Sequence, residues 1–97
     1  MEDKNAMARI RKHIYYQGSV QGVGFRFTTV RVAERYAVTG FVRNLPDGRV
    51  DVVVEGEARE IESFLADLAD SMQGYIRNAQ IDDKPYTGEF NRFDVRF

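Results

Sequence analysis

The order of apolar periodicities along the chain limits its fold more than any other feature. One stretch in the second half places apolar residues three and four positions apart, as on one face of a helix. These residues are Ile61, Phe64, Leu65, Leu68 and Met72. A stretch that begins at Gly24 has similar spacing. Its apolar residues are Phe27, Val30, Ala33 and Ala37. The chain is therefore expected to form two helices.

Short runs of alternating or β-branched residues flank both helices and predict strands. The runs are 10–16, 38–44, 50–54, the residues around Ala79 and Ile81, and 93–97. The turn sequence 45–48 joins the second and third runs as a hairpin, and Gly56 is expected to end the third strand. The order is β-α-β-β-α-β plus one strand. Because two helices cannot cover both faces of such a sheet, we expect an α+β two-layer sandwich, with an antiparallel or mixed sheet and both helices on one face.

Composition indicates one small domain. The 97 residues contain no cysteine and a single histidine, His13, which we expect at the surface and which lacks partners for a metal site. We expect no metal and no cofactor. The net charge of −1 disfavours nucleic acid as a partner, and no apolar run approaches the ~20 residues of a membrane span. We expect residues 9–97 to form the domain after a flexible 1–8, in a soluble, cytoplasmic protein that is monomeric.

The segment Gly18-Ser19-Val20-Gln21-Gly22-Val23-Gly24-Phe25-Arg26 places glycines and an arginine between the first strand and the first helix. Glycines allow successive backbone N–H groups to turn inward, and the helix that follows adds the positive end of its dipole. Arg26 adds a planar fork of donors. A simple glycine-rich turn is the alternative, but a phosphate group would satisfy all three features. Phe27 stands where a dinucleotide-binding fingerprint needs a third glycine, and no Gly-Lys pair exists for a Walker A loop.

Within the segment 40–50, Asn44 is the last residue of the predicted strand and stands just before the turn. Asn44 is either a turn-forming residue that bonds its own backbone, or an amide at the end of the sheet that both donates and accepts and so orients a water molecule. Arg43 alternates with Asn44 and is expected to point away from it.

Both segments resemble the signatures of the acylphosphatase family, enzymes that hydrolyse the carboxyl–phosphate bond of acyl phosphates. Residues 18–26 resemble the first signature throughout, and 40–44, followed by Gly48, Val50 and Gly56, resemble the second. The resemblance implies a ferredoxin-like sandwich and covers nearly the whole chain. Two departures concern helix ends: Tyr36-Ala37 replaces a usual glycine, and Tyr75 follows Gly74 where proline is common.

The resemblance also implies roles for the site residues. Arg26 and the backbone N–H groups of the loop would bind the substrate phosphate, Asn44 would position the attacking water, and Gly18 would only shape the loop. The loop residues are Gln21, Gly22, Val23, Gly24, Phe25 and Arg26. The partners would be a small acyl phosphate and the phosphate released from it.

Three alternatives remain at this point. A binding module could hold a phosphate compound without hydrolysing it, although such a module has no need of the Asn44 amide. The chain could also resemble the acylphosphatase-like part of a hydrogenase maturation factor, although its short length and lack of cysteine favour a separate enzyme. Nucleic-acid binding by the sheet conflicts with the charge balance and with the missing aromatic signature.

Overall fold

The elements follow one another in the order expected from the sequence. The computed structural model describes residues 8–97 and contains β1 (Arg9–Gly18), α2 (Phe25–Ala33), β2 (Val38–Asn44), β3 (Val50–Glu57), α3 (Ala58–Ser71), β4 (Ile76–Lys84) and β5 (Phe93–Val95). Among these residues, no helix is long and apolar enough to cross a membrane. The segment expected to be flexible, 1–8, lies outside the described residues except for Ala8.

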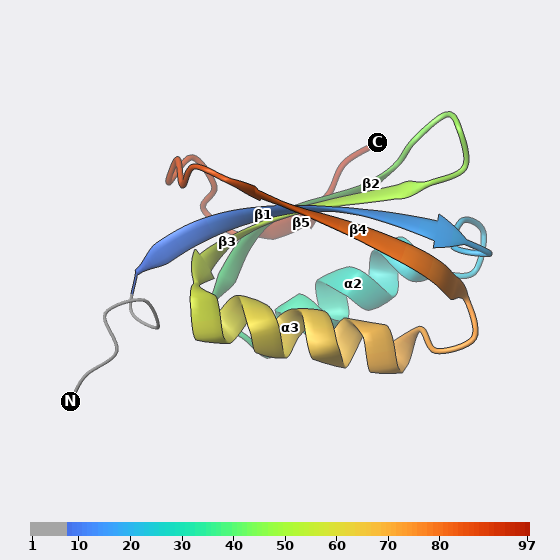
Figure 1. Cartoon of the computed structure of the whole chain (residues 1–97), viewed down its shortest axis with the longest axis horizontal. Helices are drawn as coiled ribbons and strands as arrows, with labels where there is room; N and C mark the ends of the chain where they lie inside the picture. The colour runs from blue at the N-terminus through green and yellow to red at the C-terminus, as the bar shows by residue number, and fades with distance from the viewer. Residues whose placement is uncertain (1–7) are drawn as a thin grey trace.

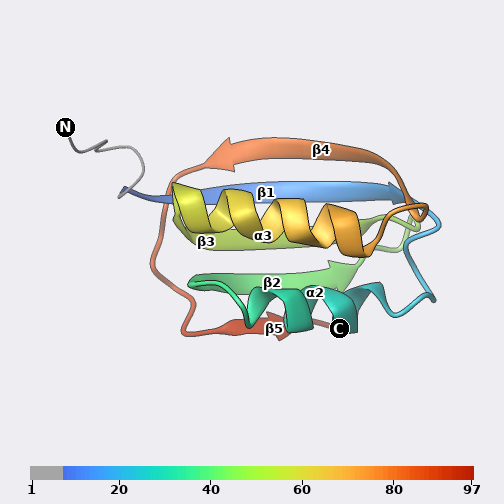
Figure 2. The ribbon, with the colours of Figure 1, turned by 90° about the horizontal axis from the view of Figure 1, so that it is seen from below.

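The strands form one mixed sheet in the order β4-β1-β3-β2-β5. Strand β1 pairs antiparallel with β3 and β4, β2 pairs antiparallel with β3, and β5 adds parallel to β2. Both helices pack against the same face of this sheet, as Figures 1 and 2 show. The structure therefore confirms the two-layer α+β sandwich, which is of the ferredoxin-like type.

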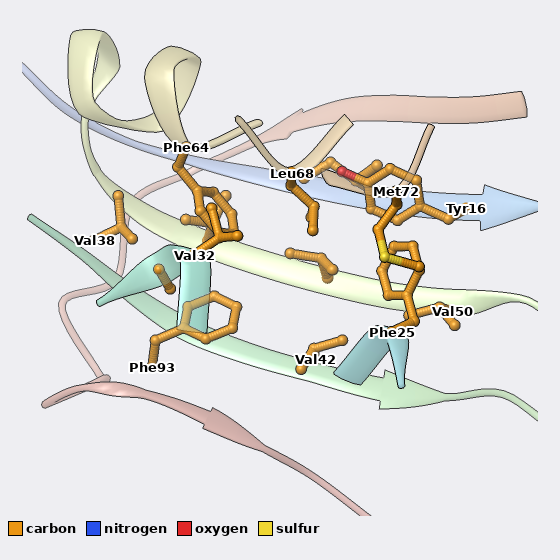
Figure 3. Packing of buried hydrophobic residues seen from close by; sticks show 14 of the residues in the cluster. Tyr16, Phe25, Val32, Val38, Val42, Val50, Phe64, Leu68, Met72 and Phe93 are labelled. Atoms are coloured by element: carbon orange, nitrogen blue, oxygen red, sulfur yellow. The ribbon is translucent and has the colours of Figure 1, made fainter. Parts of the chain in front are cut away.

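The core lies between the helices and the inner face of the sheet. The apolar stripe predicted for the second helix is confirmed in α3, where Ile61, Phe64 and Leu68 are fully buried. Figure 3 shows Phe64 and Leu68 pointing from α3 towards the sheet. The ring of Phe64 packs against that of Phe93 at a centroid distance of 5.4 Å, so α3 and the β5 edge share one core.

The apolar stripe predicted for the first helix is wrong at Phe27 and Ala37, whereas Ala33 is buried and Val30 is partly buried against the core. The buried residues of α2 are Phe25, Thr29, Val32 and Ala33. Phe27 is instead 67% exposed, and the helix ends at Ala33, before Ala37. Apolar residues surround this short helix, so their spacing alone does not define the buried face.

One prediction about a strand also needs correction, and the predicted fourth strand, which is confirmed as β4, carries exposed apolar residues. Strand β3 continues through Gly56 to Glu57, because Gly56 pairs with β1 and β2 at once. In β4, Ile81 lies opposite Ile14 on the inner side, yet Ala79 and Ile81 are both exposed. The reason is that β4 is an edge strand beyond α3 (Figure 2), so no helix covers these side chains.

The end of the first helix closes without the glycine that the family resemblance leads us to expect. The backbone N–H of Ala37 donates to Glu60 Oε1 at 2.8 Å, and the Tyr36 hydroxyl donates to Asp67 Oδ2 at 2.8 Å. Both acceptors belong to α3. These two contacts fasten the segment after α2 to α3, in addition to the local backbone hydrogen bonds from the Arg35 N–H to the Val32 carbonyl oxygen and from the Tyr36 N–H to the Ala33 carbonyl oxygen.

The face of the sheet that carries no helices contains a buried carboxylate, Asp51. His13 Nε2 hydrogen-bonds Asp51 Oδ1, and Arg43 Nε donates to Asp51 Oδ2 at 3.0 Å. The side chain of His13 is only 19% exposed, so the expectation of a surface histidine is wrong, and burial beside a carboxylate partner is the reason. Arg43 lies on this outer face, as its alternation with Asn44 predicts.

A second buried carboxylate, Glu55, fastens the segment 85–92 to the same face. It accepts hydrogen bonds from the Thr87 N–H at 2.8 Å, the Thr87 hydroxyl at 2.9 Å and the Gly88 N–H at 3.0 Å. Burial acts to raise the pKa of Glu55, but the hydrogen bonds from Thr87 and Gly88 and the charge of Arg11 hold it below its ordinary value.

Candidate active site

Residues 19–24 form a loop between the end of β1 and the first turn of α2. Gly18 allows the loop to leave β1 close to the start of β4: a Cβ there would lie 2.3 Å from the Tyr75 carbonyl oxygen, which accepts the Ser19 N–H at 2.9 Å. Gly24 caps α2 with a left-handed φ of 74°, which glycine adopts without steric cost. Its carbonyl oxygen accepts the Thr28 N–H at 2.9 Å, so the helix begins directly at the end of the loop.

The backbone N–H groups of this loop are available to an anion. Within residues 8–97, those of Gln21, Gly22, Val23 and Gly24 form no well-aligned hydrogen bond with the chain. The N–H groups of Phe25 and the next residues in the first turn of α2 have no acceptor within the helix, and the dipole makes this end positive. Free donors and a positive helix end therefore meet in one place.

The side chain of Gln21 ties the loop to the turn between β2 and β3. Its Nε2 donates to the carbonyl oxygens of Leu45 at 2.8 Å and Arg49 at 2.9 Å. The turn is itself closed, since the Arg49 N–H donates to Asp47 Oδ1 at 3.1 Å and thereby lowers the pKa of Asp47. One amide side chain thus fixes the loop relative to the end of β2, where Asn44 lies.

Asn44 and Arg26 line the same small cavity. Its volume is about 240 Å³. It is lined by Val20, Gly22, Gly24, Phe25, Arg26, Phe27 and Asn44. The Asn44 Oδ1 atom is buried and accepts no hydrogen bond from residues 8–97. A buried acceptor of this kind is costly unless it is satisfied by a bound molecule, so it marks the cavity as a binding site.

Arg26 provides the positive charge at the cavity. The side chain is half-buried, and its guanidinium lies over the ring of Phe97 at 5.0 Å from the centroid. Within residues 8–97, no carboxylate side chain forms an ion pair with it. The charge therefore lies beside an aromatic ring and is not neutralised by a carboxylate of the described residues. Phe97, expected in the last strand, lies beyond β5 and is 98% exposed.

Comparison with known proteins decides the family. The acylphosphatase family model matches residues 12–95. The chain belongs to the acylphosphatase family. It is 38% identical over 88 residues to an acylphosphatase of Syntrophus aciditrophicus, covering 90% of this chain and 92% of that protein. Its fold superimposes on the crystal structure of an acylphosphatase from Bacillus subtilis with a TM-score of 0.83 at 27% identity, covering 91% of this chain and 99% of that one.

A larger protein contains a similar domain. The chain also resembles the HypF protein of T. kodakarensis, with a TM-score of 0.79 and 33% identity, covering 91% of this chain but 12% of that one. A resemblance to part of a larger protein, which was an alternative at the level of the sequence, is thus found alongside the match to separate acylphosphatases. Those separate acylphosphatases are matched over nearly their whole length.

The structure places most of the predicted acylphosphatase site together. Gly22, Gly24, Phe25, Arg26 and Asn44 all line the cavity. Gln21 and Val23 do not line it, although their N–H groups belong to the same loop, and Gly18 lies at the end of β1. Within residues 8–97, no group of three or more His, Cys, Asp or Glu side chains is placed to hold a metal ion.

Two features of the acylphosphatase site were missed by the sequence interpretation. One is the side chain of Gln21, a residue for which the sequence predicted only a role of the backbone N–H. Its side-chain hydrogen bonds go to the turn 45–49, which comes close to Gln21 only in the folded chain. The other is Phe27, which was assigned to the core but lines the cavity. An aromatic residue directly after Arg26 is the one sequence signal that could have indicated this position.

Proposed function

We propose that the cavity between the loop and Asn44 binds the phosphate group of an acyl phosphate. The free N–H groups of residues 21–26 and the Arg26 guanidinium supply donors to the phosphate oxygens. A guanidinium about 4 Å from a phosphate charge contributes about 4 kcal/mol at an effective dielectric constant of about 20. That is enough to define an anion site in a chain whose net charge is −1.

Asn44 is proposed to orient the attacking water. Its unpartnered Oδ1 can accept an O–H from a water molecule and so direct the water oxygen at phosphorus. The bond from phosphorus to the bridging oxygen breaks as the new P–O bond forms, and the electron pair leaves with the carboxylate. The proton of the water passes to a phosphate oxygen. This unpartnered acceptor beside the cationic loop is the observation that carries the proposal, because a simple phosphate binder does not require it.

This reaction needs few catalytic groups from the protein. The leaving carboxylate has a conjugate acid with a pKa near ~4, so it departs without protonation and no general acid is needed. Positioning and stabilisation of charge in a loose phosphoryl transition state account for the catalysis. We therefore infer an acylphosphatase that works without a metal or cofactor. We also propose that it acts as a monomer in the cytoplasm.

A colorimetric assay with benzoyl phosphate, in the presence of a chelator, tests this function. A stable phosphate monoester is assayed beside it. Rapid hydrolysis of benzoyl phosphate and no hydrolysis of the monoester are expected, because only the acyl phosphate has a leaving group that needs no acid. Failure to hydrolyse benzoyl phosphate, or a loss of activity with chelator, contradicts the proposal.

A further inference from the structure

Phe27 lines both the site cavity and a second concavity beside it. The ring lies in the first turn of α2 and is 67% exposed, although it follows the half-buried Arg26 directly. It lines the cavity that contains Arg26 and Asn44, and it also lines a neighbouring hollow between α2 and β5. An exposed aromatic residue shared by two concavities differs from an isolated surface apolar residue, which needs no explanation.

The second concavity, which we call the acyl hollow, extends from the site along one side of α2. It is lined by Phe27, Val30, Arg31, Glu34, Asp94 and Val95. The helical members are three, four and seven residues from Phe27, so they follow one face of the helix. The hollow has a volume of about 380 Å³. An enclosed apolar cavity of about 150 Å³ is known to hold benzene, so the hollow is large enough for an aromatic ring, which would stay partly exposed to solvent because the hollow is open at the surface.

The charges of the acyl hollow do not favour a second anion. Two carboxylates, Glu34 and Asp94, and one guanidinium, Arg31, line it, and a second guanidinium, Arg92, pairs with Asp94 at 2.7 Å, so the hollow carries no excess positive charge to attract an anion. The apolar members Phe27, Val30 and Val95 favour a neutral group that can be removed from water.

We propose that the acyl hollow receives the acyl group of the substrate, with Phe27 packed against it, and that the chain prefers acyl phosphates with a neutral aromatic or bulky apolar acyl group. This inference rests on the proposed function, because the phosphate must occupy the neighbouring cavity. Because Phe27 lines both concavities, an acyl group that extends past its ring from a phosphate beside Arg26 and Asn44 would enter the hollow. An acetyl group is too small to use this surface, and an acyl group with a second anionic end would lose its hydration beside Phe27, Val30 and Val95 without an unpaired excess of positive charge to compensate.

The test compares kcat/KM for benzoyl phosphate, acetyl phosphate and succinyl phosphate, each divided by its uncatalysed rate. The wild type should favour benzoyl phosphate over both others. Phe27→Ala should lower the ratio of benzoyl to acetyl phosphate about tenfold, the scale of losing an apolar contact in a specificity pocket. Phe27→Tyr keeps the ring and should restore the ratio. The control is Ile81→Ala, which removes a similarly exposed apolar side chain from β4, remote from the site, and should leave the ratio unchanged.

The outcomes separate this inference from the function on which it rests. A wild-type chain that hydrolyses none of the three compounds refutes the function. A chain that hydrolyses them but favours acetyl or succinyl phosphate, or whose benzoyl to acetyl ratio stays within twofold in Phe27→Ala, refutes the acyl hollow and leaves the function intact.

Discussion

The side chain of Gln21 joins the two segments that form the site, so its removal tests whether their relative position controls turnover. Its Nε2 donates to the carbonyl oxygens of Leu45 at 2.8 Å and Arg49 at 2.9 Å. Gln21→Ala removes both hydrogen bonds without changing the net charge. Each bond contributes a net of about 0.5–1.5 kcal/mol, so the free energy of unfolding should fall by about 1–3 kcal/mol. Urea denaturation followed by circular dichroism measures this loss.

The kinetic effect of Gln21→Ala should appear in kcat. Arg26 and the loop N–H groups remain, so KM for benzoyl phosphate should change little. Asn44 loses its fixed position relative to the loop, and a misplacement of about 1 Å can reduce the rate about 10²-fold. We therefore expect kcat to fall between about tenfold and a hundredfold.

Gln17→Ala is the matched control for this prediction. Gln17 is also a glutamine near the end of β1, but within residues 8–97 its exposed side chain accepts one hydrogen bond, from Asn78 Nδ2 at 3.4 Å. It should change neither stability nor kcat. Loss of stability in Gln21→Ala with an unchanged kcat would refute the argument that this link positions the catalytic groups.

The remaining predictions concern the catalytic groups and acid stability. Arg26→Lys keeps the charge but loses the planar fork, so phosphate should bind more weakly in calorimetry and turnover should fall; a fully active lysine variant argues against bidentate recognition. Asn44→Ala should lower kcat about 10²–10³-fold with a smaller change in KM, and an unchanged rate of phosphate release contradicts its role. Because folding holds the pKa of Glu55 below its ordinary 4.5, the folded chain binds fewer protons there than the unfolded one, and stability should decrease as the pH falls below that value. Glu55→Gln should flatten this acid decrease in urea denaturation between pH 3 and 6; an equally steep decrease contradicts the assignment.

The sequence predicted the structure best where the residues that determine it lie close together in the chain. The α3 stripe was predicted because Ile61, Phe64 and Leu68 are far enough along one helix to define a single face. Of the cavity residues, Gly22, Gly24, Phe25 and Arg26 were predicted because the backbone geometry that gathers them is local to residues 18–26, and Asn44 was predicted at the end of the second strand. Such local geometry depends on glycines and on the start of a helix, and both can be recognised in the sequence.

The sequence predicted the structure least well where contacts between residues distant in the chain decide which side chains are buried. Phe27 was assigned to the core because α2 carries apolar residues on several sides, and only packing against the sheet selects Phe25 and Val32. Ile81 lies opposite the buried Ile14, but β4 is an edge strand that neither helix covers, so Ile81 is exposed. His13 is half-buried because Asp51 comes to it from β3, a contact that no local pattern indicates.

Hydrolysis of benzoyl phosphate in water enriched in ¹⁸O tests the central claim most directly. If the loop and Arg26 hold the phosphate while Asn44 directs water at phosphorus, a single turnover places the label in inorganic phosphate and leaves benzoate unlabelled. Mass spectrometry of both products distinguishes the two positions of attack. Label in benzoate would mean that water attacks the carbonyl carbon, and it would contradict the arrangement of the site proposed for Arg26 and Asn44.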